Sequence, residues 1–176
     1  IRDDLMCTIH DVLQHVSNKR NVRGDALDMR RRIYNEHNKN DVFDVKFSCG
    51  GLMDIDFIVH VGLLECARSN KITTGRPTAA QINFLQKYHW LSAFEASILL
   101  RASHVLMLLN QLCALTAETS NEFLSRHRND KILGKFQNEV GLNNVHCKQE
   151  ICKICDQVFA IFIDKIGDYT QDVEQH

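Results

Sequence analysis

Apolar residues recur at intervals of three and four along almost the whole chain, the spacing of an α-helix with one buried face. The pattern predicts an all-α fold, an antiparallel helix bundle forming a single domain over residues 1–176. The predicted helices cover residues 3–16, 26–37, 52–67, 78–88, 92–115 and 147–166, with one or two shorter helices within 123–140.

Two segments depart from this helical pattern. Residues 42–47 read Val-Phe-Asp-Val-Lys-Phe, which is rich in β-branched and aromatic side chains and alternates over part of its length. That pattern predicts a short extended segment, and because one strand is not stable alone, we expect it to pair with a neighbour. Residues 168–176 are mostly polar, and we expect them to form a frayed tail.

Local signals mark where some helices begin and end. Thr78 with Gln81, and Ser92 with Glu95, have the spacing of a capping box, in which each side chain bonds the backbone of the other residue. Gly141 is placed to end the helix before it.

Composition and charge support a helical globular protein and exclude several other classes. One Pro and eight Gly leave little material for the many turns of an all-β fold. A net charge of −1 with 44% hydrophobic residues argues against disorder and against a protein that coats nucleic acid. Seven Cys, an odd number, fit a reducing compartment, so we expect a cytoplasmic protein. No run of 18 apolar residues occurs, so no membrane span is predicted.

The His and Cys residues offer few candidate metal ligands. Cys147, Cys152 and Cys155 beside His146 have part of an iron–sulfur spacing. However, Cys155 lies on the apolar stripe of its helix, where a free Cys acts as a small hydrophobic residue, so we predict no metal there. His10-Asp11 and His15 are spaced wrongly for two ligands on one helical face.

A basic stretch runs from Lys19 to Arg32 and includes Arg20, Arg23, Arg30 and Arg31. No aromatic side chain lies between these cations to stack on nucleic-acid bases. The stretch favours a solvated helix face, with an anion contact by one or two arginines as the alternative.

The segment Phe43–Phe57 carries the most informative pattern. Lys46 precedes the pair Gly50-Gly51, which opens a helix, and Asp54 falls in the first turn of that helix. A helix start offers free N–H groups to an anion, and a nearby Lys adds charge, although the same residues also suit an ordinary glycine turn. Asp54 and Asp56 face nearly opposite ways on a helix, so they cannot share one metal. We expect one to face a site and the other to hold structure.

The same segment resembles the signature of the glutamine synthetase adenylyltransferase/deadenylylase family, in which FD-[LI]-K leads to GGI-x-[DE]IEF-[ILV]-[VA]-Q. The resemblance extends to the Met-Arg pair at Met29-Arg30 and to the helical stretch 81–115. Asp56, His60 and Leu52 replace the family's Glu, Gln and Ile. Asp at position 54 resembles the adenylylating half of these two-part enzymes.

The resemblance implies a helical C-terminal domain of an enzyme that transfers AMP from ATP to a tyrosine of glutamine synthetase, with magnesium. It implies Lys46, Gly50 and Gly51 at a nucleotide-facing edge, and Asp54 orienting a cation or a basic side chain at a domain junction. The implied partners are glutamine synthetase, a PII-type nitrogen signal protein and an upstream nucleotidyltransferase domain of the same chain, with no nucleic acid and no membrane.

The chain contains no Gly-Ser followed by Asp-x-Asp, the motif that holds magnesium in nucleotidyltransferases. We therefore expect no catalytic residue, no bound metal and no activity in this chain alone. It starts at Ile1 in mid-pattern, which suggests a piece of a longer protein. The alternatives are the helical domain of a related protein uridylyltransferase and a non-enzymatic module that binds a partner through a groove.

Overall fold

The computed structural model describes residues 2–37, 44–69, 76–116 and 144–170. Within these ranges the chain is helical, with turns between the helices and no strand. The helices are α1 (Arg2–Lys19), α2 (Val22–His37), α3 (Leu52–Ala67), α4 (Thr78–Lys87), α5 (Ala93–Thr116) and α7 (Asn144–Lys165). The prediction of an all-α fold is therefore confirmed.

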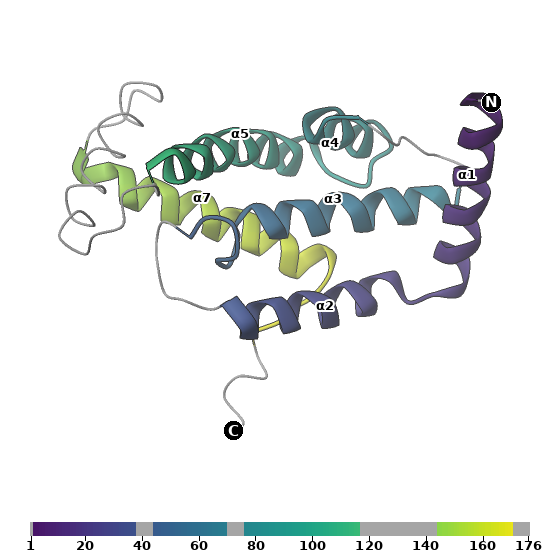
Figure 1. Cartoon of the computed structure of the whole chain (residues 1–176), viewed down its shortest axis with the longest axis horizontal. Coiled ribbons are helices and arrows are strands. Elements are labelled where there is room, and N and C mark those ends of the chain that lie inside the picture. The colour runs from purple at the N-terminus through teal and green to yellow at the C-terminus, as the bar shows by residue number, and fades with distance from the viewer. Residues whose placement is uncertain (1, 38–43, 70–75, 117–143, 171–176) are drawn as a thin grey trace.

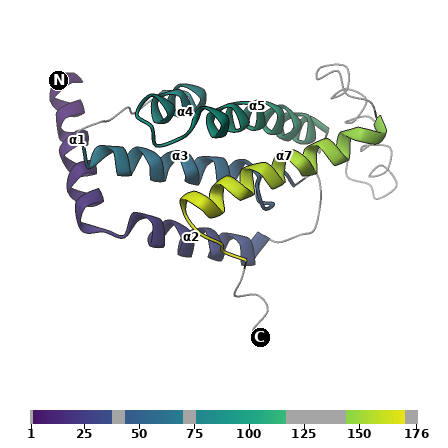
Figure 2. The same cartoon turned by 180° about the vertical axis from the view of Figure 1, so that it is seen from behind.

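Helix α3 lies at the centre of the arrangement and contacts α1, α2, α4, α5 and α7 (Figure 1). Helices α4 and α5 run along one side of α3, and α2 runs along the other. Helix α7 returns antiparallel to α5, and α1 stands across the far end of α3 (Figures 1 and 2). This position explains the sequence of α3, which is apolar on most of its circumference.

One hydrophobic core joins these helices. Most of its fully buried side chains come from α3, α4, α5 and α7 and include Ile55, Ile58, Ile82, Leu85, Leu99, Leu106, Leu109, Val158 and Phe162. Among the described residues one helix, α5, is long and apolar enough to cross a membrane by those two criteria alone. Here α5 serves as a core helix, with Leu99, Ala102 and Leu106 at 0% exposure.

The helix boundaries follow the sequence pattern closely, and one of the two capping boxes forms. The Ser92 N–H donates to Glu95 Oε2 at 2.7 Å, and the Glu95 N–H donates to Ser92 Oγ at 3.1 Å. The predicted Thr78 cap is wrong: Pro77 occupies the cap position of α4, and no side chain caps that helix. The helices predicted within 123–140 and the stop at Gly141 lie outside the described residues.

The extended segment predicted over 42–47 is a turn in its described part. The Ser48 N–H bonds the Asp44 carbonyl at 3.1 Å, and the Leu52 N–H bonds the Val45 carbonyl at 2.8 Å. Val45 is 1% exposed, so its β-branched side chain serves the core of a helical protein rather than a sheet. The strand prediction is thus wrong for 44–47, while residues 42–43 lie outside the described ranges.

The frayed tail predicted over 168–176 is wrong for its first three residues. Tyr169 is 0% exposed and packs edge-on against Phe159 and Phe162. The Asp168 carboxylate accepts bonds from the Thr170 N–H and hydroxyl, which fixes the chain beyond α7. Composition alone suggested a polar tail because polar residues outnumber Tyr169, the single aromatic residue that anchors this segment. Residues 171–176 lie outside the described part.

Gly50 holds the turn before α3 against α7. Its φ of +71° is a left-handed conformation that suits glycine, and a Cβ there would lie 1.8 Å from the Cys155 carbonyl oxygen. A side chain at this position therefore clashes with backbone, which cannot move aside as a side chain can.

We predict that Gly50→Ala lowers the free energy of unfolding by more than about 2 kcal/mol, because conformational strain adds to steric overlap. Gly24→Ala, where the nearest atoms belong to the Asn21 side chain, should change it by less than about 1 kcal/mol. Urea denaturation of both variants measures this, and equal effects would show that the turn readily moves away from α7.

Glu65 of α3 joins three parts of the fold. It accepts bonds from Arg23 Nε and Nη2 of α2 at 2.7 and 2.8 Å, and from Trp90 Nε1 at 2.8 Å. Burial raises the pKa of the Glu65 carboxyl, but the hydrogen bonds from Arg23 and Trp90 and the charge of Arg23 outweigh it, so the pKa lies below its usual value.

A lowered carboxyl pKa in the folded state contributes stability above the unfolded pKa of about 4.3, and this contribution is lost as pH falls through the folded pKa. We predict that the stability difference between the native chain and Glu65→Gln is largest near pH 6 to 7 and shrinks below about pH 4. Urea midpoints measured across this range test it, and a pH-independent difference would contradict it.

Candidate functional site

A buried polar network lies beneath the turn that precedes α3. Arg30 of α2 and Asp54 of α3 are both 0% exposed, and Arg30 Nε donates to Asp54 Oδ1 at 2.5 Å. The second carboxylate oxygen, Oδ2, accepts the Gly50 N–H at 2.6 Å and the Tyr169 hydroxyl at 2.8 Å. The network thus joins α2, the turn, α3 and the segment after α7.

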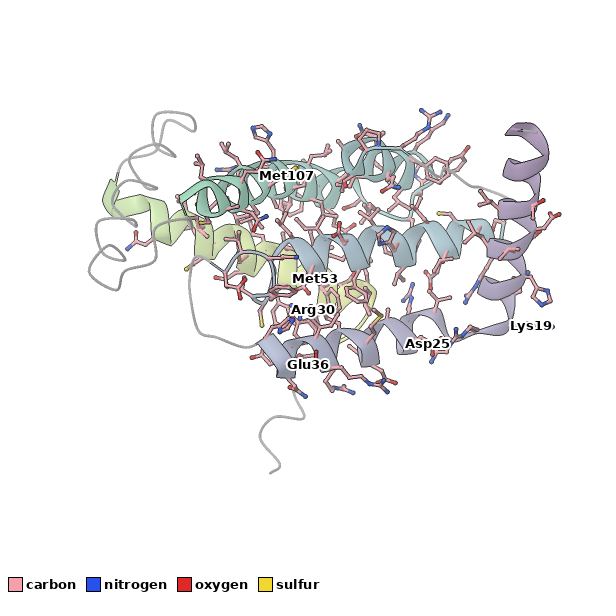
Figure 3. All side chains as sticks on the ribbon, viewed as in Figure 1. Lys19, Asp25, Arg30, Glu36, Met53 and Met107 are labelled. Carbon is pink, nitrogen blue, oxygen red and sulfur yellow. The ribbon has the colours of Figure 1, made fainter. Side chains whose placement is uncertain are left out.

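Arg30 also closes the turn itself. Its Nη2 donates to the carbonyls of Phe47 and Ser48 at 2.8 and 3.2 Å and to the Tyr169 hydroxyl at 3.1 Å, and its Cζ lies 4.5 Å from the centre of the Tyr169 ring. Figure 3 shows Arg30 between α2 and the start of α3, beneath Met53. The guanidinium therefore sets the path of the chain from 47 to 50.

The position of Arg30 on α2 explains its burial. Leu27, Arg30 and Tyr34 are spaced at three and four, so they share one helical face, and Leu27 and Tyr34 pack against the core. Sequence reasoning assigned Arg30 to a solvated basic face. The signal that it missed is that Arg30 lies between the apolar Leu27 and Tyr34 on one helical face.

Burial dominates the electrostatics of the network. Burial raises the pKa of the Asp54 carboxyl, while the charge and hydrogen bond of Arg30, the Gly50 N–H and the Tyr169 hydroxyl oppose that rise. Burial, and next the charge of Asp54, raises the pKa of the Tyr169 hydroxyl, so it stays protonated and acts as a donor. The carboxylate depends on its donors for its charge, as expected of a structural ion pair.

Of the four predicted site residues, the structure leaves only Lys46 exposed. Gly50, Gly51 and Asp54 are buried. The N–H groups that open α3 bond within the chain: those of Gly51, Leu52 and Met53 reach the carbonyls of Ser48, Val45 and Lys46. A nucleotide contact at this edge stays a prediction, and in this geometry it depends on Lys46.

Asp54 binds a basic side chain, that of Arg30 of this same chain, inside the fold. The role at a domain junction that the family resemblance implied stays a prediction. The expected division of labour between the two aspartates is also present, since Asp54 is buried and Asp56 is exposed. Asp54 holds structure in this fold, and a role for either aspartate in a site stays a prediction.

The outer face of α3 is the surface that sequence reasoning missed. The face consists of Met53, Asp56, Phe57, His60 and Leu64, which share an arc of about 100° and are exposed or half-buried. Asp56 and His60 are four residues apart and interact electrostatically: burial raises the pKa of Asp56, and the charge of His60 lowers it. The sequence signal for this face was that Asp54 and Asp56 occupy alternate positions in the first two turns of an otherwise apolar helix.

The cysteine cluster has no metal-binding geometry among its described members. Cys152 is exposed, and Cys155 is half-buried, with its pKa raised to about 12 by burial and by nearby negative groups. No group of three His, Cys, Asp or Glu side chains converges within the ranges that the structure describes. The side chains of His146 and Cys147 lie outside those ranges, so the absence of a metal there stays a prediction.

We predict that Asp54→Asn lowers the free energy of unfolding by about 3–5 kcal/mol, because it leaves the Arg30 charge buried without its counter-charge. The matched control is Asp56→Asn, two residues along the same helix but exposed, which should change stability by less than about 0.5 kcal/mol. Chemical denaturation measures both. A loss of only about 1 kcal/mol for Asp54→Asn, typical of a helix-dipole effect, would show that the pair is not structural.

The fold and this network define the chain as an all-α domain whose signature turn is held by a buried Arg–Asp–Tyr cluster. Similarity to curated proteins places it beside one group of enzymes. It is 28% identical over 131 residues to the bifunctional glutamine synthetase adenylyltransferase/adenylyl-removing enzyme of Rhodopseudomonas palustris (strain BisB5). It is 31% identical over 107 residues to that of Bradyrhizobium diazoefficiens, and 30% identical over 108 residues to that of Xanthomonas axonopodis pv. citri.

These alignments cover 71%, 61% and 60% of the chain, but only 13%, 11% and 12% of the respective relatives. The match is therefore to part of a domain, and it confirms the resemblance drawn from the signature. No family model matches the chain. No solved structure matches it either.

Proposed function

We propose that this chain is the C-terminal helical domain of an enzyme that adenylylates glutamine synthetase. In the longer protein an upstream nucleotidyltransferase domain would transfer AMP from ATP to a tyrosine, releasing pyrophosphate, and the helical domain would support and orient that domain. The observation that carries the proposal is the signature turn, because its family residues meet in one buried cluster that fixes how the start of α3 is presented.

In this proposal the magnesium ions belong to the upstream domain. A two-metal centre needs several convergent carboxylates, and no such group exists among the described side chains. The bound nucleotide would supply the phosphate that is attacked. The role of this chain in AMP transfer would be to bind the nucleotide, because Lys46 is an exposed point charge suited to a phosphate oxygen.

The outer face of α3 is the second element of the proposal. Met53 and Leu64, both half-buried, offer apolar groups, and the exposed Asp56 and His60 offer polar groups on the same face. Phe57, also half-buried, lies on this face and packs partly against the core. An apolar surface with a few directed polar groups is typical of a contact between domains. This face would dock the nucleotidyltransferase domain and bring Lys46 to its active-site edge.

The proposed partners in the cell are glutamine synthetase, as substrate, and a PII-type signal protein, with the full-length enzyme in the cytoplasm. The names of the relatives support the first of these. A protein uridylyltransferase domain and a non-enzymatic binding module are the alternatives. A Gly-Ser followed by Asp-x-Asp upstream of this segment in the full-length protein would distinguish the enzymes from the module.

We predict that Lys46→Ala in the full-length enzyme slows AMP transfer to glutamine synthetase by about tenfold or more. Loss of one charge-assisted contact in the transition state is worth at least about 1.4 kcal/mol. Stability should change by less than about 0.5 kcal/mol, because Lys46 is exposed and lies 4.9 Å from the Phe47 ring without a further bond among the described residues.

The matched control is Lys87→Ala. Lys87 is also exposed and lies 5.8 Å from the ring of the next residue, Tyr88, but it ends α4, away from the signature turn. The full-length Lys87→Ala enzyme should transfer AMP at the native rate. Equal rates for the Lys46→Ala and native enzymes, with unaltered thermal melts, would contradict the prediction and show that the glycine turn has only a structural role.

A further inference from the structure

An apolar groove lies between the start of α5 and the second half of α7. Its volume is about 250 Å³, and it is lined by Phe94, Glu95, Ile98, Gln157, Ala160, Ile161 and Asp164. Phe94 stands at the rim of this groove and is 72% exposed, more than any other large hydrophobic side chain described. Leaving one phenylalanine so exposed forgoes the burial that normally stabilises an aromatic residue.

The groove and the phenylalanine are matched in size and lie side by side. The groove has room for about one large side chain, and Phe94 cannot fill it while standing at its rim. A surface that carries both a protruding anchor and a neighbouring recess can bind a second copy of itself. Each anchor then enters the recess of the other copy, and every contact is made twice.

The charges along α7 are arranged for the same kind of pairing. Lys153, Gln157, Ala160 and Asp164 are spaced at four, three and four, so they form one outward row about 16 Å long. Lys153 and Asp164 are each 68% exposed, and each forms an ion pair with a near neighbour on the same helix, Glu150 and Lys165 respectively.

Two copies of this row can be related by a two-fold axis that passes through its middle, so that the rows run in opposite directions. Lys153 of each copy then lies opposite Asp164 of the other, while the small side chain of Ala160 lets the two helices approach closely. Exposed neighbour pairs of this kind are weak, so exchanging them for pairs between copies costs little. The charges therefore favour an antiparallel contact of α7 with a second α7.

We propose that this groove is a homodimer interface, in which Phe94 of each copy inserts between α5 and α7 of the other. Both helices are seen together, running antiparallel, in Figures 1 and 2. The interface is separate from the outer face of α3 and from Lys46, so the proposal stands independently of the proposed enzymatic role.

Sedimentation equilibrium of the purified chain tests this directly. The native chain should dimerise reversibly, and Phe94→Ala should weaken the dimer by at least about tenfold, as truncation of an aromatic anchor does. Met29→Ala, which truncates another exposed hydrophobic residue at 59% exposure on α2, should leave the dimer unchanged. Circular dichroism melts, run at a concentration so low that all three proteins are monomeric, should coincide, because neither side chain is in the core.

A charge exchange tests the arrangement of the two copies. Lys153→Glu and Asp164→Lys should each weaken the dimer, and the double variant should restore it, because the row then carries the same pairs with the signs reversed. A native chain that stays monomeric at every concentration would overturn the proposal. A dimer unaffected by Phe94→Ala, or not restored in the double variant, would overturn it equally.

Discussion

The ion pair between Arg30 and Asp54 is the constraint on which the signature region depends. Two opposite charges without solvent contact are stable only when their remaining hydrogen-bonding atoms are largely satisfied. Here the turn supplies carbonyls to Arg30, and Gly50 and Tyr169 supply donors to Asp54. The requirement to satisfy this pair therefore explains the shape of the turn, its glycine and the docking of the chain end.

This network changes the meaning of the signature residues. A glycine pair before a helix is a common anion site, but here the N–H groups of the turn bind the chain's own carbonyls and the Asp54 carboxylate. The glycine that matters most, Gly50, is needed because α7 backbone lies where a Cβ would be. The pair thus builds a base that holds the exposed Lys46 and the outer face of α3 at the surface of the domain.

The domain has two surfaces for which we propose different contacts. The outer face of α3 is continuous with the signature turn and combines Asp56 and His60 with apolar side chains. The groove between α5 and α7 is lined by Ile98, Ala160 and Ile161 among others and carries Phe94 at its rim. The two contacts that we propose, with another domain and between copies, involve different helices.

The sequence by itself determined the helices, because the three- and four-residue spacing of apolar side chains reflects burial of one helical face. It also determined the Ser92–Glu95 cap, which depends on residues three apart. The tertiary structure decided the rest: that 44–47 is a turn, that Tyr169 is buried, and that Asp54 holds structure while Asp56 faces outward. Those outcomes depend on Arg30, 24 residues from Asp54, and on Tyr169, 115 residues from it, and local patterns carry no information on which distant charges and donors will meet.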